Sequence, residues 1–270
     1  MRHHILLDKI MTNPMHSLFD LTGHIALCTG GSSGIGKRMA WALLNAGAKV
    51  ILVARSEKNL AQAKTEFTSQ SGMDESVATI AADLSDRSCL GDIVSSATDI
   101  FGAPDILINA AGINLRQAAD DITDETWDQT LNINLSTPFF LARHCSAGMK
   151  QKGSGRIINI ASLQSYRAFP NSMPYGASKG GITQLTRAMA ENWSADGIMA
   201  NAIAPGFFPT ELTKAVYENP EMLAHNAGMT AIGRNGELAD LDGTTIFLAS
   251  RASSYVTGQV IAVDGGFTAK

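Results

Sequence analysis

Short apolar runs alternate with longer amphipathic stretches along most of the chain. The runs are typical of buried parallel strands and lie at residues 24–29, 49–54, 77–82, 105–109, 156–161, 199–204 and 259–263. Helical spacing of apolar residues predicts helices at 35–46, 57–69, 87–101, 123–149 (as one helix or two), 175–195 and 237–249. Strands that alternate with helices predict a doubly wound α/β fold, with a parallel sheet covered by helices on both faces.

The first 17 residues differ from this pattern. They hold one short apolar run, at residues 5–7, which is too short for the core of a signal peptide. We therefore expect residues 1–17 to be a disordered or loosely ordered extension and residues 18–270 to be a single catalytic domain. No run approaches the roughly 18 apolar residues of a membrane helix. The most irregular stretch inside the domain is 205–235.

Composition excludes several kinds of partner. The 270 residues carry a net charge of −4 and show no basic stripe, so nucleic acid is not expected to bind. Cys28, Cys89 and Cys145 share no metal-ligand spacing and the six histidines form no cluster, so no metal site is predicted. A low, odd number of cysteines favours reduced thiols and a cytoplasmic protein.

A glycine-rich loop follows the first predicted strand. It reads Thr29-Gly-Gly-Ser-Ser-Gly-Ile-Gly36 and opens the first predicted helix. Glycines allow the backbone to approach a pyrophosphate, whose charge is then met by the amides of the helix N-terminus. The loop therefore predicts dinucleotide binding by Gly30, Ser32, Ser33, Gly34, Ile35 and Gly36.

A tyrosine and a lysine lie one helical turn apart, at Tyr175 and Lys179. A phenol ordinarily titrates near pH 10, and a nearby ammonium group favours the phenolate and lowers that pKa. The pair is thus a candidate acid/base, with the Ser162 hydroxyl as a candidate ligand of a substrate oxygen. The alternative is an ordinary helical pair on a solvated face, and the glycine loop upstream favours the catalytic interpretation.

Five motifs in order resemble those of the short-chain dehydrogenase/reductase family. They are the T-G-x-x-x-G-x-G loop, Asn109-Ala-Ala-Gly112, Ser162, Tyr175 and Lys179, and the resemblance covers about residues 19–267. It implies a Rossmann-type sheet of seven strands, hydride transfer with NAD or NADP, a small-molecule substrate and a homotetramer.

The resemblance also implies roles for single residues. Tyr175 is the acid/base, Lys179 lowers its pKa and binds the nicotinamide ribose, Ser162 orients the substrate oxygen, and Asn134 holds a relay water. Residues 207–229 form the substrate lid. Further cofactor contacts are implied at Asp83, Leu84, Asn109, Ala110, Gly112, Pro205, Gly206 and Thr210.

The end of the second strand favours NADP(H) and leaves NAD(H) as the alternative. A carboxylate there would repel a ribose 2′-phosphate, but this chain has Ala54 followed by Arg55, which can pair with a phosphate. Many NADP-dependent members carry a second basic residue in the glycine loop, where this chain has Ser33.

The substrate is predicted from local resemblance and from one arginine. Stretches 18–23, 111–116 and 201–211 resemble sugar-acid and polyol dehydrogenases such as gluconate 5-dehydrogenase. Arg116 is placed to pair with a sugar-acid carboxylate beside Ser162 and Tyr175, or alternatively with Asp120 or Asp121. Arg167 is a second candidate cation. Two alternatives remain: a 3-oxoacyl-(acyl-carrier-protein) reductase, although no dense basic cluster suits an acidic carrier, and a catalytically idle cofactor-binding regulator.

Overall fold

Seven parallel strands form one sheet at the centre of the computed structural model, which describes residues 14–270. The order is β3-β2-β1-β4-β5-β6-β7. This confirms the predicted fold class. The strands are β1 (Ile25–Thr29), β2 (Lys49–Ala54), β3 (Val77–Ala81), β4 (Ile106–Asn109), β5 (Gly155–Ile160), β6 (Ile198–Pro205) and β7 (Val260–Val263). The order reverses between β1 and β4, where open α/β sheets bind ligands beyond the carboxyl ends of their strands.

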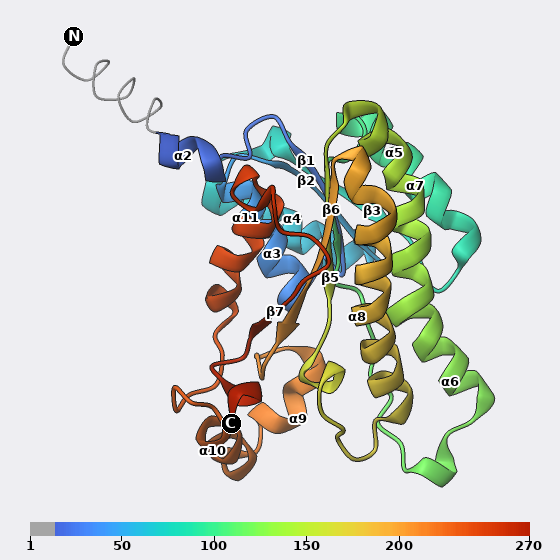
Figure 1. Cartoon of the computed structure of the whole chain (residues 1–270), viewed down its shortest axis with the longest axis vertical. Coiled ribbons are helices and arrows are strands. Elements are labelled where there is room, and N and C mark those ends of the chain that lie inside the picture. The colour runs from blue at the N-terminus through green and yellow to red at the C-terminus, as the bar shows by residue number, and fades with distance from the viewer. Residues whose placement is uncertain (1–13) are drawn as a thin grey trace, which may run out of the picture.

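Helices cover both faces of this sheet, as Figure 1 shows. One face carries α3 (Gly34–Asn45), α4 (Glu57–Ser71) and α11 (Asp242–Ala249). The other carries α5 (Leu90–Phe101), α7 (Thr137–Lys152) and α8 (Met173–Trp193). Because alternate strand residues point to opposite faces, Ala26 and Cys28 pack with the first group, whereas Ile25 and Leu27 pack with the second. Continuous apolar runs in the sequence result from this burial on both faces.

The predicted helix over 123–149 is two helices joined by a π-helical turn. α6 (Asp124–Leu131) begins at a Thr123 capping box, the turn spans Asn132–Ser136, and α7 follows with Pro138 in its first turn. The predicted helices over 87–101 and 237–249 each begin as a 3-10 turn, at Arg87–Cys89 and Leu238–Leu241.

The N-terminal prediction concerns residues 1–17. Residues 1–13 lie outside the described part of the chain, and α2 (Pro14–Phe19) is a short helix that precedes the domain.

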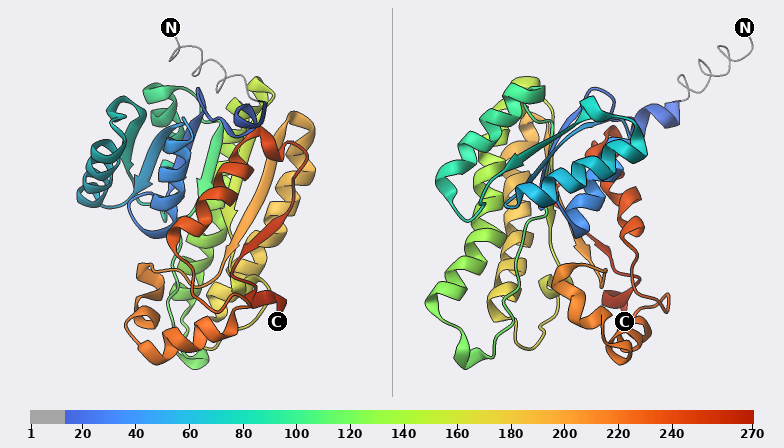
Figure 2. Two further views of the ribbon diagram at one scale, coloured as in Figure 1. Left: turned by 90° about the vertical axis from the view of Figure 1, so that its left-hand side faces the viewer. Right: turned by 180° about the vertical axis from the view of Figure 1, so that it is seen from behind.

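The irregular stretch after β6 contains two short helices, α9 (Lys214–Tyr217) and α10 (Pro220–Met229). They lie with the C-terminal segment at the carboxyl end of the sheet (Figure 2). α10 has no buried residue. Lys270 Nζ donates to the carbonyl of Thr230, the residue after the helix, at 2.9 Å, and Asn235 donates to the Leu223 carbonyl at 2.9 Å.

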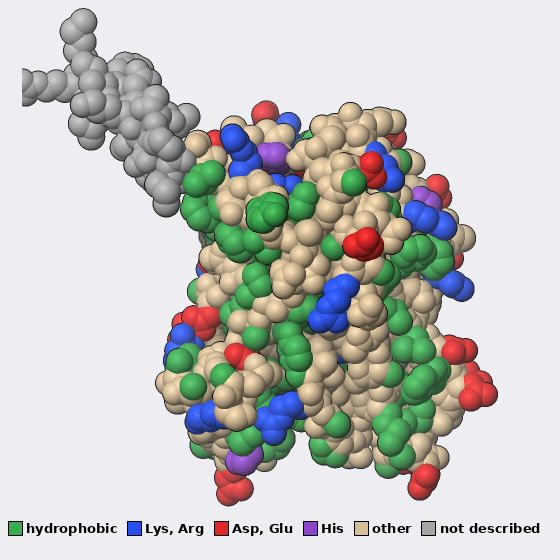
Figure 3. Space-filling model, viewed as in Figure 1, with side chains coloured by type: hydrophobic (Ala, Val, Ile, Leu, Met, Phe, Trp, Pro, Cys, Tyr) green, Lys and Arg blue, Asp and Glu red, His purple; other side chains and the backbone are tan. Residues whose placement is uncertain are grey.

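Charged side chains of both signs are interspersed on the face of the molecule drawn in Figure 3. None of the helices within residues 14–270 has the length and apolar character needed to cross a membrane.

Candidate active site

Two positions of the glycine loop between β1 and α3 leave no room for a side chain. Gly30 has a φ of +65°, and a Cβ atom there would lie 3.0 Å from the backbone of Ala110. A Cβ atom on Gly36 would lie 2.5 Å from the Gly30 carbonyl oxygen. The loop therefore folds onto itself and onto the start of the β4–α6 connection, and only glycine fits at these two positions.

The N-terminus of α3 suits an anionic cofactor group. Ser33 is its N-cap residue but makes no side-chain capping hydrogen bond, so the first amides of this 12-residue helix are not capped by it. Thr210 of the segment after β6 reaches the same loop, because a Cβ atom on Gly34 would lie 3.2 Å from Thr210 Cγ2. The loop and its surroundings therefore fit a pyrophosphate.

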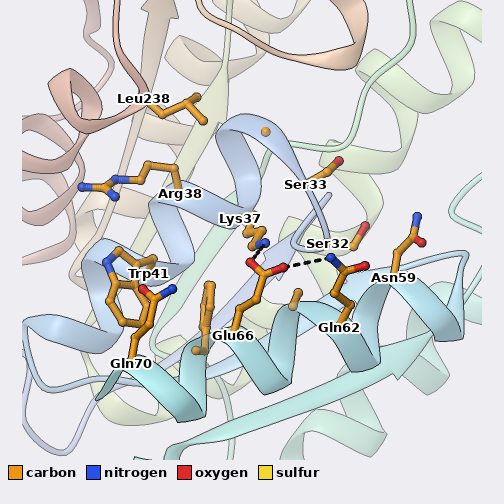
Figure 4. A pocket seen from close by; sticks show the side chains of 13 residues that line it. Ser32, Ser33, Lys37, Arg38, Trp41, Asn59, Gln62, Glu66, Gln70 and Leu238 are labelled. Carbon is orange, nitrogen blue, oxygen red and sulfur yellow. Dashed lines mark hydrogen bonds and ion pairs between the residues drawn. The ribbon is translucent and has the colours of Figure 1, made fainter. Parts of the chain in front are cut away.

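A groove of about 520 Å³ lies between α3 and α4 beside this loop (Figure 4). Lys37, one turn beyond Ser33, forms an ion pair with Glu66 across it, and Gln62 donates to Glu66 at 3.0 Å. The groove thus holds a basic residue near the loop, although the loop itself has Ser33. Its lining includes Ser32, Ser33, Lys37, Asn59 and Gln62.

Asp83 and Arg55 lie together after two neighbouring strands. Asp83 accepts hydrogen bonds from the Ser85 amide (3.0 Å) and hydroxyl (2.9 Å), and these bonds lower its pKa, with a smaller contribution from the positive charge of Arg55. Thr137 donates to the Leu84 carbonyl at 2.8 Å, which fastens this loop to α7. Arg55 is exposed, as a residue that meets a phosphate from solvent would be.

The segment after β4 is held by buried polar side chains. The Thr29 hydroxyl accepts from the amides of Ala110 (3.0 Å) and Ala111 (3.1 Å). Asn109 donates to Asn159 Oδ1 at 2.9 Å and so joins β4 to β5, as expected of a residue that steadies the sheet. Gly112 lies beside the catalytic candidates, because its Cβ atom would be 4.0 Å from Lys179 Nζ.

The two asparagines of the π-helical turn have different partners. Asn134 is buried, accepts from the Ile113 amide (2.9 Å) and donates to the Ile113 carbonyl (2.8 Å) and the Ser178 hydroxyl (3.1 Å). Asn132 instead donates to the Ser85 carbonyl at 2.7 Å. Both amide hydrogens of Asn134 are therefore engaged, so its side chain fixes the β4 loop to α8.

Ser162, Tyr175 and Lys179 meet at the carboxyl end of β5. Ser162 lies two residues after the last residue of the strand, and Tyr175 and Lys179 lie in the first two turns of α8. Lys179 is 4% exposed, its Nζ donates to the Ile160 carbonyl at 2.6 Å, and it lies 5.4 Å from the centre of the Tyr175 ring. The structure thus brings together the three residues that the sequence predicted.

Burial disfavours the charged form of both titratable groups, so it moves their pKa values in opposite directions. It raises the pKa of Tyr175, while a hydrogen bond with Ser162 and the positive charge of Arg116 act in the opposite direction. It lowers the pKa of Lys179 from 10.5 to about 8. The expected lowering of the Tyr175 pKa is therefore wrong for the site without ligands, because desolvation outweighs the nearby charges.

Pro205 is the last residue of β6, and Gly206 follows it directly. The Gly206 amide donates to the Val263 carbonyl at 2.9 Å, and a Cβ atom on Gly206 would lie 2.8 Å from Asp264 Cα. This close contact with the C-terminal segment fixes the turn at which the predicted lid, residues 207–229, begins.

The two candidate cations differ in their contacts. Arg116 is exposed and forms no ion pair with any carboxylate in the described part of the chain, so the predicted alternative of a salt bridge to Asp120 or Asp121 is not found. Arg167 packs over the Phe267 ring at 5.3 Å. Arg116 is thus the cation that acts on Tyr175.

Sequence reasoning missed two residues beside the site, Lys37 and Ser165. Lys37 was detectable as a cation one helical turn after Ser33. Ser165 was detectable from its spacing of three after Ser162, which is typical of a capping box.

Known proteins share this fold and these motifs. The family model described as enoyl-(acyl carrier protein) reductase matches residues 30–268. A gluconate 5-dehydrogenase from Gluconobacter oxydans is 38% identical over 258 residues, covering 96% of this chain and 99% of that protein. A 3-oxoacyl-(acyl-carrier-protein) reductase from Vibrio cholerae is 34% identical over 247 residues, covering 92% of this chain and 98% of that protein.

A crystal structure has the same architecture. It is a gluconate 5-dehydrogenase from Burkholderia cenocepacia J2315 in complex with NADP and tartrate, and it superposes with a TM-score of 0.89 at 36% identity, covering 95% of this chain and 99% of that one. The matched family model, the identities over nearly full length and the shared fold agree with the motifs described above. The chain therefore belongs to the short-chain dehydrogenase/reductase family of oxidoreductases.

Proposed function

We propose that the enzyme interconverts a carbonyl and a secondary alcohol in a sugar acid, with NADP(H) as its preferred cofactor. The observation that carries the substrate class is Arg116, an exposed guanidinium without a carboxylate partner in residues 14–270 whose charge acts on Tyr175. A carboxylate is a group that an unpaired arginine binds strongly, through two parallel hydrogen bonds. A polyol would lack that contact, and an acyl thioester would offer no carboxylate to Arg116.

The cofactor would be held along the carboxyl edge of the sheet. The glycine loop would receive the pyrophosphate, Asp83 and Leu84 the adenine, and Arg55 the 2′-phosphate. Within residues 14–270 the ammonium group of Lys179 donates one hydrogen bond, to the Ile160 carbonyl, so its remaining hydrogens are available to the nicotinamide ribose. When bound, the nicotinamide supplies or accepts the hydride.

The chain's own residues supply the proton and the orientation. Because its pKa is raised, Tyr175 is protonated at neutral pH and can donate its phenolic proton to a carbonyl oxygen that is being reduced. Ser162 would orient that oxygen. Asn134 would act through the backbone it fixes, since its side-chain hydrogens are engaged, and a relay water there would need another donor or acceptor.

A substrate panel tests this proposal. The wild type is expected to reduce keto-acids of sugars faster with NADPH than with NADH, and faster than it reduces acetoacetyl thioesters. Preference for the thioester would support the 3-oxoacyl reductase instead. Binding of NADPH with no turnover on any member of the panel would support a cofactor-binding regulator.

Replacement of Arg116 tests the carboxylate contact. Arg116→Ala is expected to raise KM for sugar acids about 10- to 100-fold, which corresponds to a charge-assisted hydrogen bond of roughly 1.5–3 kcal/mol. KM for neutral polyols should stay unchanged. Arg251→Ala is the control, because this exposed arginine lies at the other end of the sheet from the site. Its neighbour Ser250 accepts a hydrogen bond from Arg156 at the amino end of β5. Equal effects of Arg116→Ala on acids and polyols would refute the contact.

We further propose that the enzyme is a homotetramer, that it is located in the cytoplasm and that it acts in carbohydrate metabolism. Small exposed residues on α8, Ala177 and Gly180, support close approach of a second helix, whereas Gly181 is already packed against Leu135 of its own chain. The three cysteines are free thiols, which supports a reducing compartment. Light scattering of the purified protein tests the tetramer.

A further inference from the structure

Lys179 is joined to the end of β5 at two points. Its Nζ atom donates to the Ile160 carbonyl at 2.6 Å, and its backbone carbonyl accepts from the Ser165 hydroxyl at 2.7 Å. Ile160 is the last residue of β5, and Ser165 ends the 3-10 turn Leu163–Ser165 that follows. Ser162 therefore lies between the two points at which β5 and its turn are attached to α8.

Ser165 also holds the backbone of Ser162. The Ser162 amide donates to Ser165 Oγ at 3.3 Å, while Ser162 Oγ accepts from the Gln164 amide at 3.1 Å. A hydroxyl has one donor and two acceptor positions, so Ser165 can accept from Ser162 and donate to Lys179 at the same time. One oxygen atom thus connects the backbones of two residues of the candidate active site.

We propose that Ser165 is a positioning residue that sets the Ser162 hydroxyl against Tyr175 by fixing the β5 turn to α8. Ser165 itself does not touch the reacting atoms. The inference rests on the active site proposed above, and it assigns to Ser165 a role in catalysis rather than only in folding.

Two hydroxyls donate to the Lys179 carbonyl, and this arrangement distinguishes a catalytic role of Ser165 from a purely structural one. The Thr183 hydroxyl donates to the same carbonyl at 2.9 Å, so that carbonyl stays bonded when Ser165 is truncated. The Ser162 amide, by contrast, loses its acceptor in Ser165→Ala, and no other group within residues 14–270 replaces it. The cost therefore falls on the orientation of Ser162, and small displacements of a reacting group reduce rates strongly, by about 100-fold for 1 Å.

The test compares Ser165→Ala with Thr183→Ala, because each loses one donor to the Lys179 carbonyl but only the first releases Ser162. Ser165→Ala is expected to lower kcat by about 10-fold or more, with the Kd for NADPH changed by less than about twofold. Thr183→Ala should keep kcat within about threefold of the wild type. Ser165→Thr retains the hydroxyl and is expected to restore most of the lost kcat.

Equal losses of kcat in Ser165→Ala and Thr183→Ala, or a lower melting temperature with unchanged kcat, would overturn the proposal. Any ketone that the wild type reduces serves for this comparison. A wild type that reduces neutral ketones but no sugar acid would therefore refute the substrate proposal and leave the comparison intact.

A second readout needs no turnover. Since the hydrogen bond with Ser162 lowers the pKa of Tyr175, Ser165→Ala should raise that pKa further in a titration followed by NMR of ¹³C-labelled tyrosine. Thr183→Ala should titrate like the wild type, and Tyr175→Phe assigns the signal. An unchanged Tyr175 titration in Ser165→Ala would refute the positioning role.

Discussion

Lys179→Met tests the electrostatic cost of the buried ammonium group. Lys179 is 4% exposed, and burial lowers its pKa from 10.5 to about 8. A difference of about 2.5 pH units, at about 1.36 kcal/mol each, means that the charged lysine destabilises the ligand-free fold by about 3 kcal/mol at neutral pH. The neutral methionine avoids this cost, although it also loses the hydrogen bond to the Ile160 carbonyl.

The pH dependence separates these two effects. Below about pH 8 the lysine is charged in both the folded and the unfolded state, so the cost is fully present. Between about pH 8 and 10.5 the unfolded state binds more protons, so wild-type stability rises with pH relative to Lys179→Met. Loss of the Ile160 hydrogen bond, by contrast, adds an offset that is nearly independent of pH.

The assay is the melting temperature of wild type and variant, measured from about pH 7.5 to 10.5. Each measurement is made without cofactor and at the same protein concentration. At about 2 °C per kcal/mol for a chain of this length, the gap between wild type and variant should change by roughly 6 °C across that range, in favour of the wild type. Lys58→Met is the control, because this exposed lysine on α4 has no desolvation cost to recover. A constant gap for Lys179→Met would refute the reasoning.

Two further substitutions test the acid/base and the cofactor loop. Tyr175→Phe should abolish turnover while NADPH still binds. In the wild type the rate of alcohol oxidation should rise with pH, because the Tyr175 phenol must first lose its proton and burial raises its pKa. Retained turnover in the variant would exclude Tyr175 as the acid. Gly36→Ala places a Cβ atom 2.5 Å from the Gly30 carbonyl and should weaken NADPH binding, measured by fluorescence titration, by about 10-fold or more, whereas Gly243→Ala, on α11 with nothing within 4 Å, should bind normally. Normal binding by Gly36→Ala would mean that the loop does not hold the cofactor.

The strands were predictable from sequence because the sheet is buried on both faces. Each strand is then a continuous apolar run bounded by turn residues, as at Ile25–Thr29 before the glycine loop. The break within 123–149 was not decidable, because distant backbone groups determine it. Asn132 bonds to Ser85, Asn134 to Ile113 and Thr137 to Leu84, and none of these partners is close in sequence.

The spacing of the catalytic residues was also predictable, because an i, i+4 pair shares a helix face wherever the helix lies. The partners of Arg116 were not. Asp120 and Asp121 are near it in sequence, but they lie in a 3-10 turn, and Arg116 pairs with neither. Nearness along an irregular segment does not determine which side chains meet, so the sequence alone could not decide between a salt bridge and a substrate carboxylate as the partner of Arg116.

The direction of the Tyr175 pKa shift shows why residue spacing alone cannot establish the chemistry of this site. The sequence places an ammonium group near a phenol, which favours the phenolate if the lysine is charged. The fold also buries Lys179, and the low dielectric then disfavours both the ammonium ion and the phenolate. An anion bound close to Lys179 would favour its protonated form, and a protonated Lys179 would in turn favour the phenolate of Tyr175. The acid/base strength of Tyr175 therefore depends on what occupies the site as well as on the helical spacing that made the pair recognisable.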